Sequence, residues 1–432
     1  MAPLFVSRVP TVYSLQQLEE EYATPEKGAL SHPLKPVGDL TSSLLPRLAC
    51  LSRTSAVPSK RIRSFGDLQA IVPDSDEERS LTDFSDEDGV VPQNPPLFGF
   101  GEGSSLLDTV LLAEWEDRAE QGLFRYDVTA CPTKVLPGAY GFVAQLNEGR
   151  GSKKRPTEFR VDKVDQPFDE GKFNFKKALQ QEVLFQFDAS APGGLTYSAS
   201  APVSQSPNLV FINISPIEYG HVLLVPRVLD GLHQVVDQRS MQLALNLCHE
   251  SNNPYFRLCY NSLGAFGTVN HLHFQAYFLA APFAVERVPV EPIPAAKGLY
   301  SNIIISRLLQ YPVRGLVFEA DESAALLAPA VAAACQRLTA ANIPHNLFVV
   351  DCGQRVFLFP NAFAGAKAAG RVPKDLLDTM VDPAGFEICG HIIMKRAEDY
   401  EDLSQQSIWR LLEYASFTEE EFEKFILLAL DL

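Results

Sequence analysis

Hydrophobic and polar residues alternate most regularly between positions 270 and 278, where the sequence reads Asn-His-Leu-His-Phe-Gln-Ala-Tyr-Phe. Because successive side chains of a β-strand point to opposite faces of its sheet, this alternation predicts a strand with one apolar and one polar face. The apolar face holds Leu272, Phe274, Ala276 and Phe278. The polar face holds His271, His273, Gln275 and Tyr277. The strand therefore brings two imidazoles and an amide together on one side of a sheet.

The residues before this strand predict further strands and a helix. Apolar runs at 209–214 and 221–226 are joined by the turn sequence 215–220. Asp237 suits the N-cap of a helix, and residues 256–260 form another apolar run. This succession predicts an α+β fold in which antiparallel sheets carry flanking helices.

The second half of the chain repeats part of this pattern. Residues 346–350 and 354–359 predict a hairpin. Gly390-His391, followed by an apolar triplet, parallels Gly220-His221. We therefore expect two related halves, the second of them degenerate because it has no His-x-His.

Helix-capping sequences mark two further boundaries. Ser105 with Asp108 begins a helix near the start of the folded region, and Thr418 with Glu421 begins the last helix. We expect a catalytic half over residues 99–285 and a second half over residues 286–432.

Residues 1–98 differ from the rest in composition. They are rich in Pro and Ser and contain an acidic stretch at 74–88. Such a segment buries too little apolar area to offset its ordering entropy, so we expect it to be largely disordered. It is either a solvated acidic linker or a phosphorylated region that binds a regulatory protein.

Composition narrows the functional class. The 432 residues carry a formal net charge of −16, which argues against broad binding of nucleic-acid phosphates. No apolar run has transmembrane length and no signal peptide is recognisable, so we expect a soluble cytoplasmic protein without membrane association. The seven cysteines are scattered without a Cys-x-x-Cys pair, which fits a reducing compartment and not a disulfide framework.

A glycine-containing loop, Asn261 to Asn270, immediately precedes the histidine strand. Gly264 and Gly267 let backbone N–H groups approach an anion, and Thr268 adds a hydroxyl. Beside such a loop, a neutral imidazole is suited to attack phosphorus and form a phosphoramidate. In this interpretation His273 attacks and His271 supports it.

Two alternatives remain at this point. The histidines are incidental to a structural strand, or they bind Zn or Fe with a third ligand such as His221, Glu218 or His249. A metal site gives the glycine loop no function, so phosphoryl chemistry is favoured.

Three motifs carry a resemblance to a known superfamily. Gly220-His221-x-Leu-Leu-Val-Pro226, Asn261-x-x-Gly264 and His271-x-His273-x-Gln275 resemble the histidine-triad superfamily. The glutamine is typical of its nucleotidyltransferase branch, as in galactose-1-phosphate uridylyltransferase. From about Leu106 onward the chain is similar to the plant and green-algal GDP-L-galactose phosphorylases, most clearly at 136–150, 153–163, 261–266 and 270–277.

The resemblance implies a guanylyltransferase that converts GDP-L-galactose and phosphate into L-galactose 1-phosphate and GDP, in L-ascorbate biosynthesis. His273 then carries the guanylyl group and His271 supports it. Gln275 favours transfer over hydrolysis, because an amide binds phosphate without acting as a base for water. The alternative is a GDP-D-glucose phosphorylase or another histidine-triad transferase or hydrolase. Neither a metal nor a cofactor is expected.

Further residues in and beside these motifs complete the candidate site. His221 is expected to be structural near the site. The expected substrates are a GDP-sugar and phosphate. Whether the protein forms a homodimer is left undecided by the sequence. The basic triplet Lys153-Lys154-Arg155 contacts phosphate, acts as a nuclear import signal, or is an exposed loop. The residues expected to bind substrate are Asn261, Gly264, Gly267, Thr268, Arg257, Lys153, Lys154 and Arg155.

Overall fold

The structure is a computed structural model that describes residues 105–153, 158–191, 194–198, 206–296, 302–320 and 324–432. The acidic region 1–98 lies outside these residues, and so do Lys154 and Arg155.

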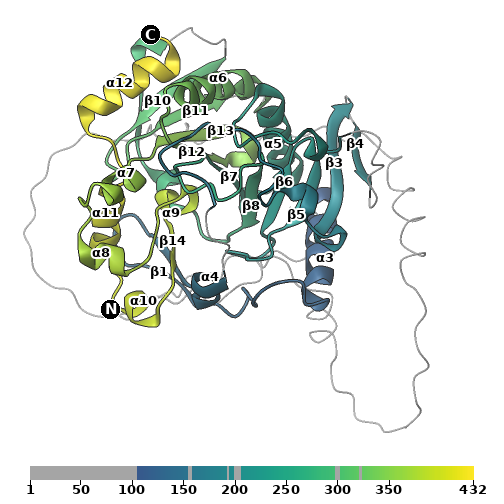
Figure 1. The fold of residues 1–432 in the computed structure, drawn as a ribbon. Helices are drawn as coiled ribbons and strands as arrows, with labels where there is room; N and C mark the ends of the chain where they lie inside the picture. Colours follow the sequence, from purple (N-terminus) through teal and green to yellow (C-terminus); the bar gives the residue numbers. More distant parts are fainter. Residues whose placement is uncertain (1–104, 154–157, 192–193, 199–205, 297–301, 321–323) are drawn as a thin grey trace, which may run out of the picture. The chain divides into compact units, whose positions relative to one another are not determined.

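One large sheet runs through the described part of the chain (Figure 1). Its strands are β3 (Val183–Ala191), β4 (Gly194–Ser198), β5 (Leu209–Ile212), β6 (Val222–Val225), β7 (Phe256–Asn261), β8 (Phe274–Phe278), β9 (Val290–Pro292), β10 (Ile303–Leu308), β11 (Leu316–Ala320), β12 (His345–Val350) and β13 (Arg355–Pro360). Their order in the 11-stranded sheet is β4-β3-β5-β6-β8-β7-β12-β13-β11-β10-β9, and every neighbouring pair is antiparallel. The predicted α+β class is confirmed.

The two halves of this sheet follow the same path. Outward from the central pair β7 and β12, one side continues through β8, β6, β5 and β3, and the other through β13, β11, β10 and β9. A helix precedes the central strand in each half: α5 (Gln238–Ser251) precedes β7 and α6 (Leu327–Ala340) precedes β12. Asn261 and Asn346 are register partners where the halves join. The predicted relationship of the halves is therefore confirmed by topology.

The predicted correspondence between Gly220-His221 and Gly390-His391 is wrong. Topology makes β6 the counterpart of β11, whereas His391 begins β14 (His391–Met394), which belongs to a different sheet. The recurrence has a local cause. Both glycines have positive φ (65° and 113°) and lead into buried strands, a turn requirement that arises without duplication.

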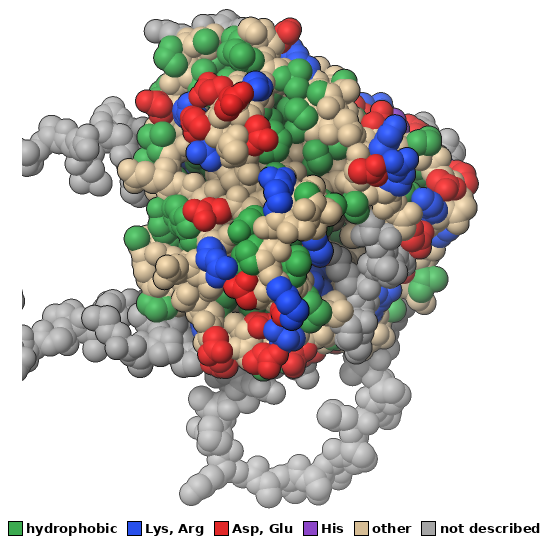
Figure 2. All heavy atoms as spheres, turned by 60° about the vertical axis from the view of Figure 1, so that its left-hand side comes forward, with side chains coloured by type: hydrophobic (Ala, Val, Ile, Leu, Met, Phe, Trp, Pro, Cys, Tyr) green, Lys and Arg blue, Asp and Glu red, His purple; other side chains and the backbone are tan. Residues whose placement is uncertain are grey.

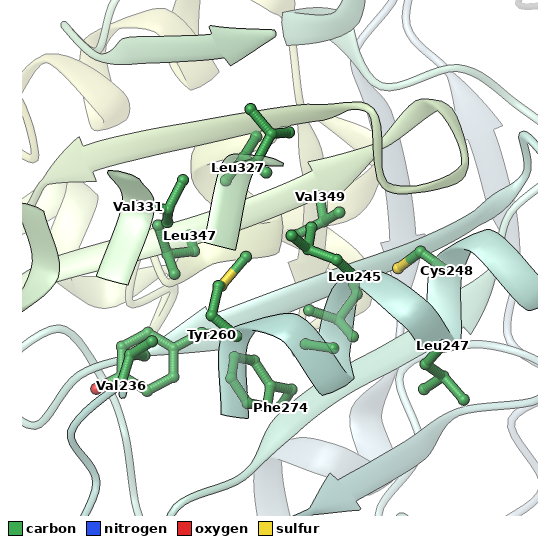
Figure 3. Close-up of a cluster of buried hydrophobic side chains, with 14 of the residues drawn as sticks. Val236, Leu245, Leu247, Cys248, Tyr260, Phe274, Leu327, Val331, Leu347 and Val349 are labelled. Atoms are coloured by element: carbon green, nitrogen blue, oxygen red, sulfur yellow. The ribbon is translucent and has the colours of Figure 1, made fainter. Parts of the chain in front are cut away.

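Helices cover one face of the large sheet. These are α3 (Leu106–Glu120), α5, α6 and α12 (Glu419–Leu430). Figure 3 shows the core beneath α5 and α6, where Leu245 and Val331 meet Tyr260, Phe274 and Leu347 from three adjacent strands. Full burial of each large apolar side chain contributes about 1.5–3 kcal/mol. The predicted caps are present at the starts of α3, α5 and α12.

A second layer covers part of the opposite face. A small sheet has the order β1-β2-β14, in which β14 is parallel to β2. The added elements are β1 (Thr133–Val135), β2 (Val143–Leu146), α4 (Glu148–Lys153), α7 (Phe363–Ala368), α8 (Lys374–Asp378), α9 (Gly385–Cys389), α10 (Ala397–Glu401) and α11 (Gln405–Glu413). The pairing of β14 with β2 places segments about 250 residues apart in sequence side by side.

The histidine strand is shorter than the alternation predicted. β8 begins at Phe274, and residues 271–273 approach it as irregular backbone. The alternation of faces nevertheless holds. The helix-side core contains Leu272, Phe274, Ala276 and Phe278.

The surface mixes charges of both signs. On the face shown in Figure 2, Lys and Arg side chains are interspersed with Asp and Glu, without a continuous basic area among the coloured residues. None of the described helices has the length and hydropathy that crossing a membrane requires.

Candidate active site

A pocket opens on the sheet face that carries the polar residues of β8. It contains about 1220 Å³ of empty space including its open mouth. Asn261 ends β7, His273 immediately precedes β8 and Gln275 lies within β8, while residues 381–395 supply Asp382, Glu387 and Lys395. Two of the three predicted catalytic side chains, His273 and Gln275, therefore line one cavity together.

Hydrogen bonds fix the orientation and tautomer of His273. Its Nδ1 lies 2.8 Å from the His271 carbonyl oxygen. Because a carbonyl only accepts, Nδ1 carries the proton and Nε2 keeps the lone pair. Burial lowers the pKa of His273 to about 4, against the opposing effect of the bond to the His271 backbone. The imidazole is therefore neutral and nucleophilic at pH 7.

Gln234 clamps the backbone of His273, a role that no sequence motif indicated. The His273 N–H donates to Gln234 Oε1 at 3.0 Å, and Gln234 Nε2 donates to the His273 carbonyl at 3.1 Å. The same amide group donates to the Asn261 carbonyl at 3.0 Å. The buried Gln234 side chain thus links two residues of the pocket, whose positions depend on it.

His271 supports His273 through its backbone and not through its ring. The His271 ring is fully buried, and its Nδ1 accepts from the Phe175 N–H at 3.1 Å. Burial, followed by the charges of His273 and Lys176, lowers the pKa of His271 to about 3. Its side chain is not among those lining the pocket.

His221 orients Gln275. Its Nδ1 accepts from the Ile217 N–H at 2.8 Å, so the ring proton is on Nε2. That proton is bonded to Gln275, because the amide NH₂ of Asn213, 3.2 Å from Nε2, offers no acceptor. The Gln275 oxygen is thereby occupied, which leaves its NH₂ as the group to present to a phosphate. His221 itself is fully buried.

Three asparagines hold one wall of the pocket. Asn261 Oδ1 accepts from Asn346 Nδ2 at 2.7 Å and from the Gly385 N–H at 3.0 Å. Asn361 Nδ2 donates to Asn346 Oδ1 and to the Pro383 carbonyl, both at 2.9 Å. Because its oxygen is occupied, the NH₂ is the group that Asn261 has left to donate in the pocket that it lines.

Gly385 allows that wall to lie close to the sheet. A Cβ at this position would stand 2.1 Å from Cys259 Sγ. Only glycine fits without displacement, so the sequence of α9 is matched to the sheet beneath it.

The loop glycines shape a turn and do not line the pocket. Gly264 has φ +82°, and a Cβ at Gly267 would lie 2.7 Å from the Asn261 carbonyl oxygen. The Gly267 N–H donates to the Ser262 carbonyl at 3.0 Å, so it is used within the loop. Neither glycine that was predicted to bind substrate lines the pocket, whereas Thr268 does.

The prediction that Arg257 contacts substrate is also wrong. Arg257 is buried, its Nε and Nη2 donate to the Glu286 carboxylate at 2.8 and 3.0 Å, and its Nη1 donates to the Leu279 carbonyl. It faces the same side of β7 as Asn261 but lies four residues away, about 13 Å along the strand.

Replacing Arg257 with Met should lower the free energy of unfolding by about 3 kcal/mol, because the Glu286 carboxylate is left poorly solvated and unpaired. Urea unfolding measures this, with KM for substrate expected to change less than about threefold. Arg160→Met is the matched control: Arg160 is exposed and paired with exposed Asp162, so its loss should leave the urea unfolding curve essentially unchanged. A large rise in KM without loss of stability would instead show that Arg257 contributes to substrate binding.

The basic side chains that line the pocket are Arg125, Arg150 and Lys395. None was predicted, although Arg150 ends the 136–150 stretch and Lys395 follows β14. Lys153 ends α4, but its side chain and residues 154–155 lie outside the described residues. No group of three or more His, Cys, Asp or Glu side chains in the described ranges is arranged to hold a metal ion.

The lowered pKa values predict an activity profile that falls only at low pH. If His273 is the nucleophile, it must be neutral to attack, so kcat/KM should be level from pH 7 to about pH 5 and should decline as pH falls through about 4. The free energy of unfolding should also fall at low pH. Histidine in the unfolded chain has a pKa of about 6.5, so the unfolded state takes up protons before the folded state does, and the fold weakens as pH falls below that value. Initial rates and urea unfolding midpoints, measured across pH 4–8, test the two expectations. A decline in kcat/KM that is centred near pH 6.5 would contradict a buried His273 nucleophile.

Comparisons with known proteins cover most of the chain. The models described as GDPGP1-like, N-terminal domain and GDPGP1-like, C-terminal domain match residues 106–277 and 284–431. The chain is 53% identical over 329 residues to GDP-L-galactose phosphorylase 1 of Arabidopsis thaliana, over 76% of this chain and 74% of that protein. It is 34% identical over 334 residues to GDP-D-glucose phosphorylase 1 of Homo sapiens, over 74% and 82%. The solved structure of yeast Ap4A phosphorylase Apa2 aligns with a TM-score of 0.47 and 15% identity, over 72% of this chain and 95% of that one.

Proposed function

This chain belongs to the GDPGP1-like family, and on that basis we propose that it acts as a GDP-L-galactose phosphorylase. It transfers a guanylyl group from GDP-L-galactose to inorganic phosphate and releases L-galactose 1-phosphate and GDP. The greater identity to the Arabidopsis protein (53%) than to the human GDP-D-glucose phosphorylase (34%) supports L-galactose over D-glucose.

The observation that carries this mechanism is the fixed tautomer of His273. In the first step its Nε2 attacks the α-phosphorus of GDP-L-galactose, the bond from that phosphorus to the bridging oxygen breaks, and L-galactose 1-phosphate leaves with the electron pair. As the new N–P bond makes the ring cationic, the Nδ1–H bond to the His271 carbonyl strengthens. In the second step a phosphate oxygen attacks, the N–P bond breaks, and GDP forms while neutral His273 returns.

Gln275 and Asn261 stabilise the charge that develops in both steps. Each has its amide oxygen occupied, by His221 and by Asn346 with Gly385, so each directs an NH₂ toward the phosphoryl oxygens. Prearranged donors of this kind stabilise a transition state at no reorganisation cost. Because an amide does not take a proton from water, Gln275 favours phosphate as the acceptor.

The scheme needs no metal or cofactor, and we propose L-ascorbate biosynthesis in the cytoplasm as its setting. The test is to measure GDP release from GDP-L-galactose, GDP-D-glucose and GDP-D-mannose with and without phosphate. We expect strict phosphate dependence and the highest kcat/KM for GDP-L-galactose. A preference for GDP-D-glucose would favour the second activity of the family, and turnover without phosphate would indicate a hydrolase.

A further inference from the structure

The pocket has an apolar end beside His273. Phe173, Phe175, Phe211 and Val269 line it and pack in one hydrophobic cluster. The ring of Phe175 lies 5.6 Å from that of Phe211 and 5.2 Å from the His273 imidazole, centroid to centroid. Flat apolar surfaces of this kind suit a purine, so the base belongs at this end.

The other end of the pocket, beside Gln275, is charged. Arg150 Nη1 donates to the Ser215 carbonyl at 2.6 Å, which holds the guanidinium at the wall. The Ser215 N–H in turn donates to Asn213 Oδ1 at 3.0 Å, and Asn213 Nδ2 lies 3.2 Å from His221 Nε2, so these contacts connect Arg150 to the ring beside Gln275. The line of groups is therefore Phe175, His273, Gln275 and Arg150.

Lys395 joins Arg150 from the opposite half of the chain. A Cβ at Gly151 of α4 would lie 3.2 Å from Lys395 Cβ, so the residue after Arg150 packs directly on the Lys395 stem. Lys395 Nζ donates to the Met380 carbonyl, which keeps the ammonium group on the pocket wall. Asp382 and Glu387 stand on the same wall, and Asp382 is paired with Lys367 at 2.9 Å.

We propose that Arg150 and Lys395 form the site for the phosphate that is not transferred: the hexose 1-phosphate group in the first step and inorganic phosphate in the second. This rests on the proposed function, since each step requires a second phosphate next to the guanylyl phosphorus. A guanidinium and an ammonium group from different halves bind a doubly charged phosphate by charge-assisted hydrogen bonds. The carboxylates of Asp382 and Glu387 are acceptors for hexose hydroxyls. The second half, which lacks the His-x-His motif, thus contributes Lys395 and the two carboxylates to the acceptor side of the site.

The test compares GDP with GMP, which differ only by the second phosphate. Affinities are measured by calorimetry in full-length His273→Asn protein, so that neither nucleotide reacts, with and without Lys395→Met. We expect the Kd for GDP to rise about tenfold or more and the Kd for GMP to change less than about twofold. In the chain that retains His273, Lys395→Met should raise KM for phosphate by a similar factor. Lys374→Met is the matched control, because Lys374 is an exposed lysine outside the pocket, and should change neither affinity.

Retained GMP affinity shows that the variant is folded, and Arg150→Gln provides the same comparison if Lys395→Met does not fold. Equal weakening of GDP and GMP, or no effect on GDP in either variant, would overturn the acceptor site. Failure of the proposed function is distinguished by the unsubstituted chain, which would then lack phosphate-dependent release of GDP altogether.

Discussion

Replacing His273 with Asn should lower kcat for phosphorolysis by about 10,000-fold, since the nitrogen proposed to attack phosphorus is removed. Asn retains a polar side chain of smaller volume, so the fold and nucleotide affinity should change little. The measurement is GDP release from GDP-L-galactose at saturating phosphate, with a urea unfolding curve for the same protein.

His233→Asn is the control for this substitution. His233 is half-exposed and lies 3.4 Å from Asp165, so its loss should leave kcat within about twofold. Retention of more than about one per cent of activity in His273→Asn would mean that another group performs the attack.

Replacing Gln275 with Glu should lower kcat by about 100- to 1,000-fold, because the NH₂ that faces the phosphoryl oxygens becomes a carboxylate oxygen that repels them. The two side chains have nearly the same shape, so packing is preserved. Initial rates of both half-reactions measure the effect.

Two further substitutions separate the loss of the hydrogen-bond donor from the added negative charge in Gln275→Glu. Gln275→Leu removes the donor without adding charge and should be less damaging than Gln275→Glu. Gln238→Glu changes the same group at the exposed start of α5 and should leave the rate unaffected. If kcat falls by less than about tenfold in Gln275→Glu, Gln275 does not stabilise the transition state.

Much of the fold was predictable because its signals are local. Alternation over residues 272–278 identified both faces of β8, and Asp237 and Thr418 cap helices where predicted. That His273 and Gln275 share a site was predictable for a similar reason: they lie two residues apart in the sequence, and both line the pocket.

The remainder of the site depends on contacts between distant parts of the chain. Lys395 and Glu387 reach the pocket because β14 pairs with β2 and because Asn361 binds the Pro383 carbonyl. No pattern within a short stretch records such pairings. Arg257 is the opposite case. Its position near the motifs in sequence suggested a contact with substrate, whereas its side chain forms a buried ion pair with Glu286.

The repeat was predicted for an incorrect reason. The Gly390-His391 sequence resembles Gly220-His221 because each glycine forms a turn that leads into a buried strand. The relationship between the two halves is visible only in the order of the strands in the large sheet. In that path β13 occupies the place of β8, and it carries no histidine. One half therefore holds His273, and the other supplies a wall of its pocket.

The central claim is that the guanylyl group is carried on His273 Nε2. The most direct measurement is to incubate the protein with GDP-L-galactose without phosphate and map the adduct by mass spectrometry. We expect one guanylyl group on His273, labile in acid as a phosphoramidate is, and released as GDP when phosphate is added. An adduct on another residue, or one that persists in His273→Asn, would contradict this mechanism.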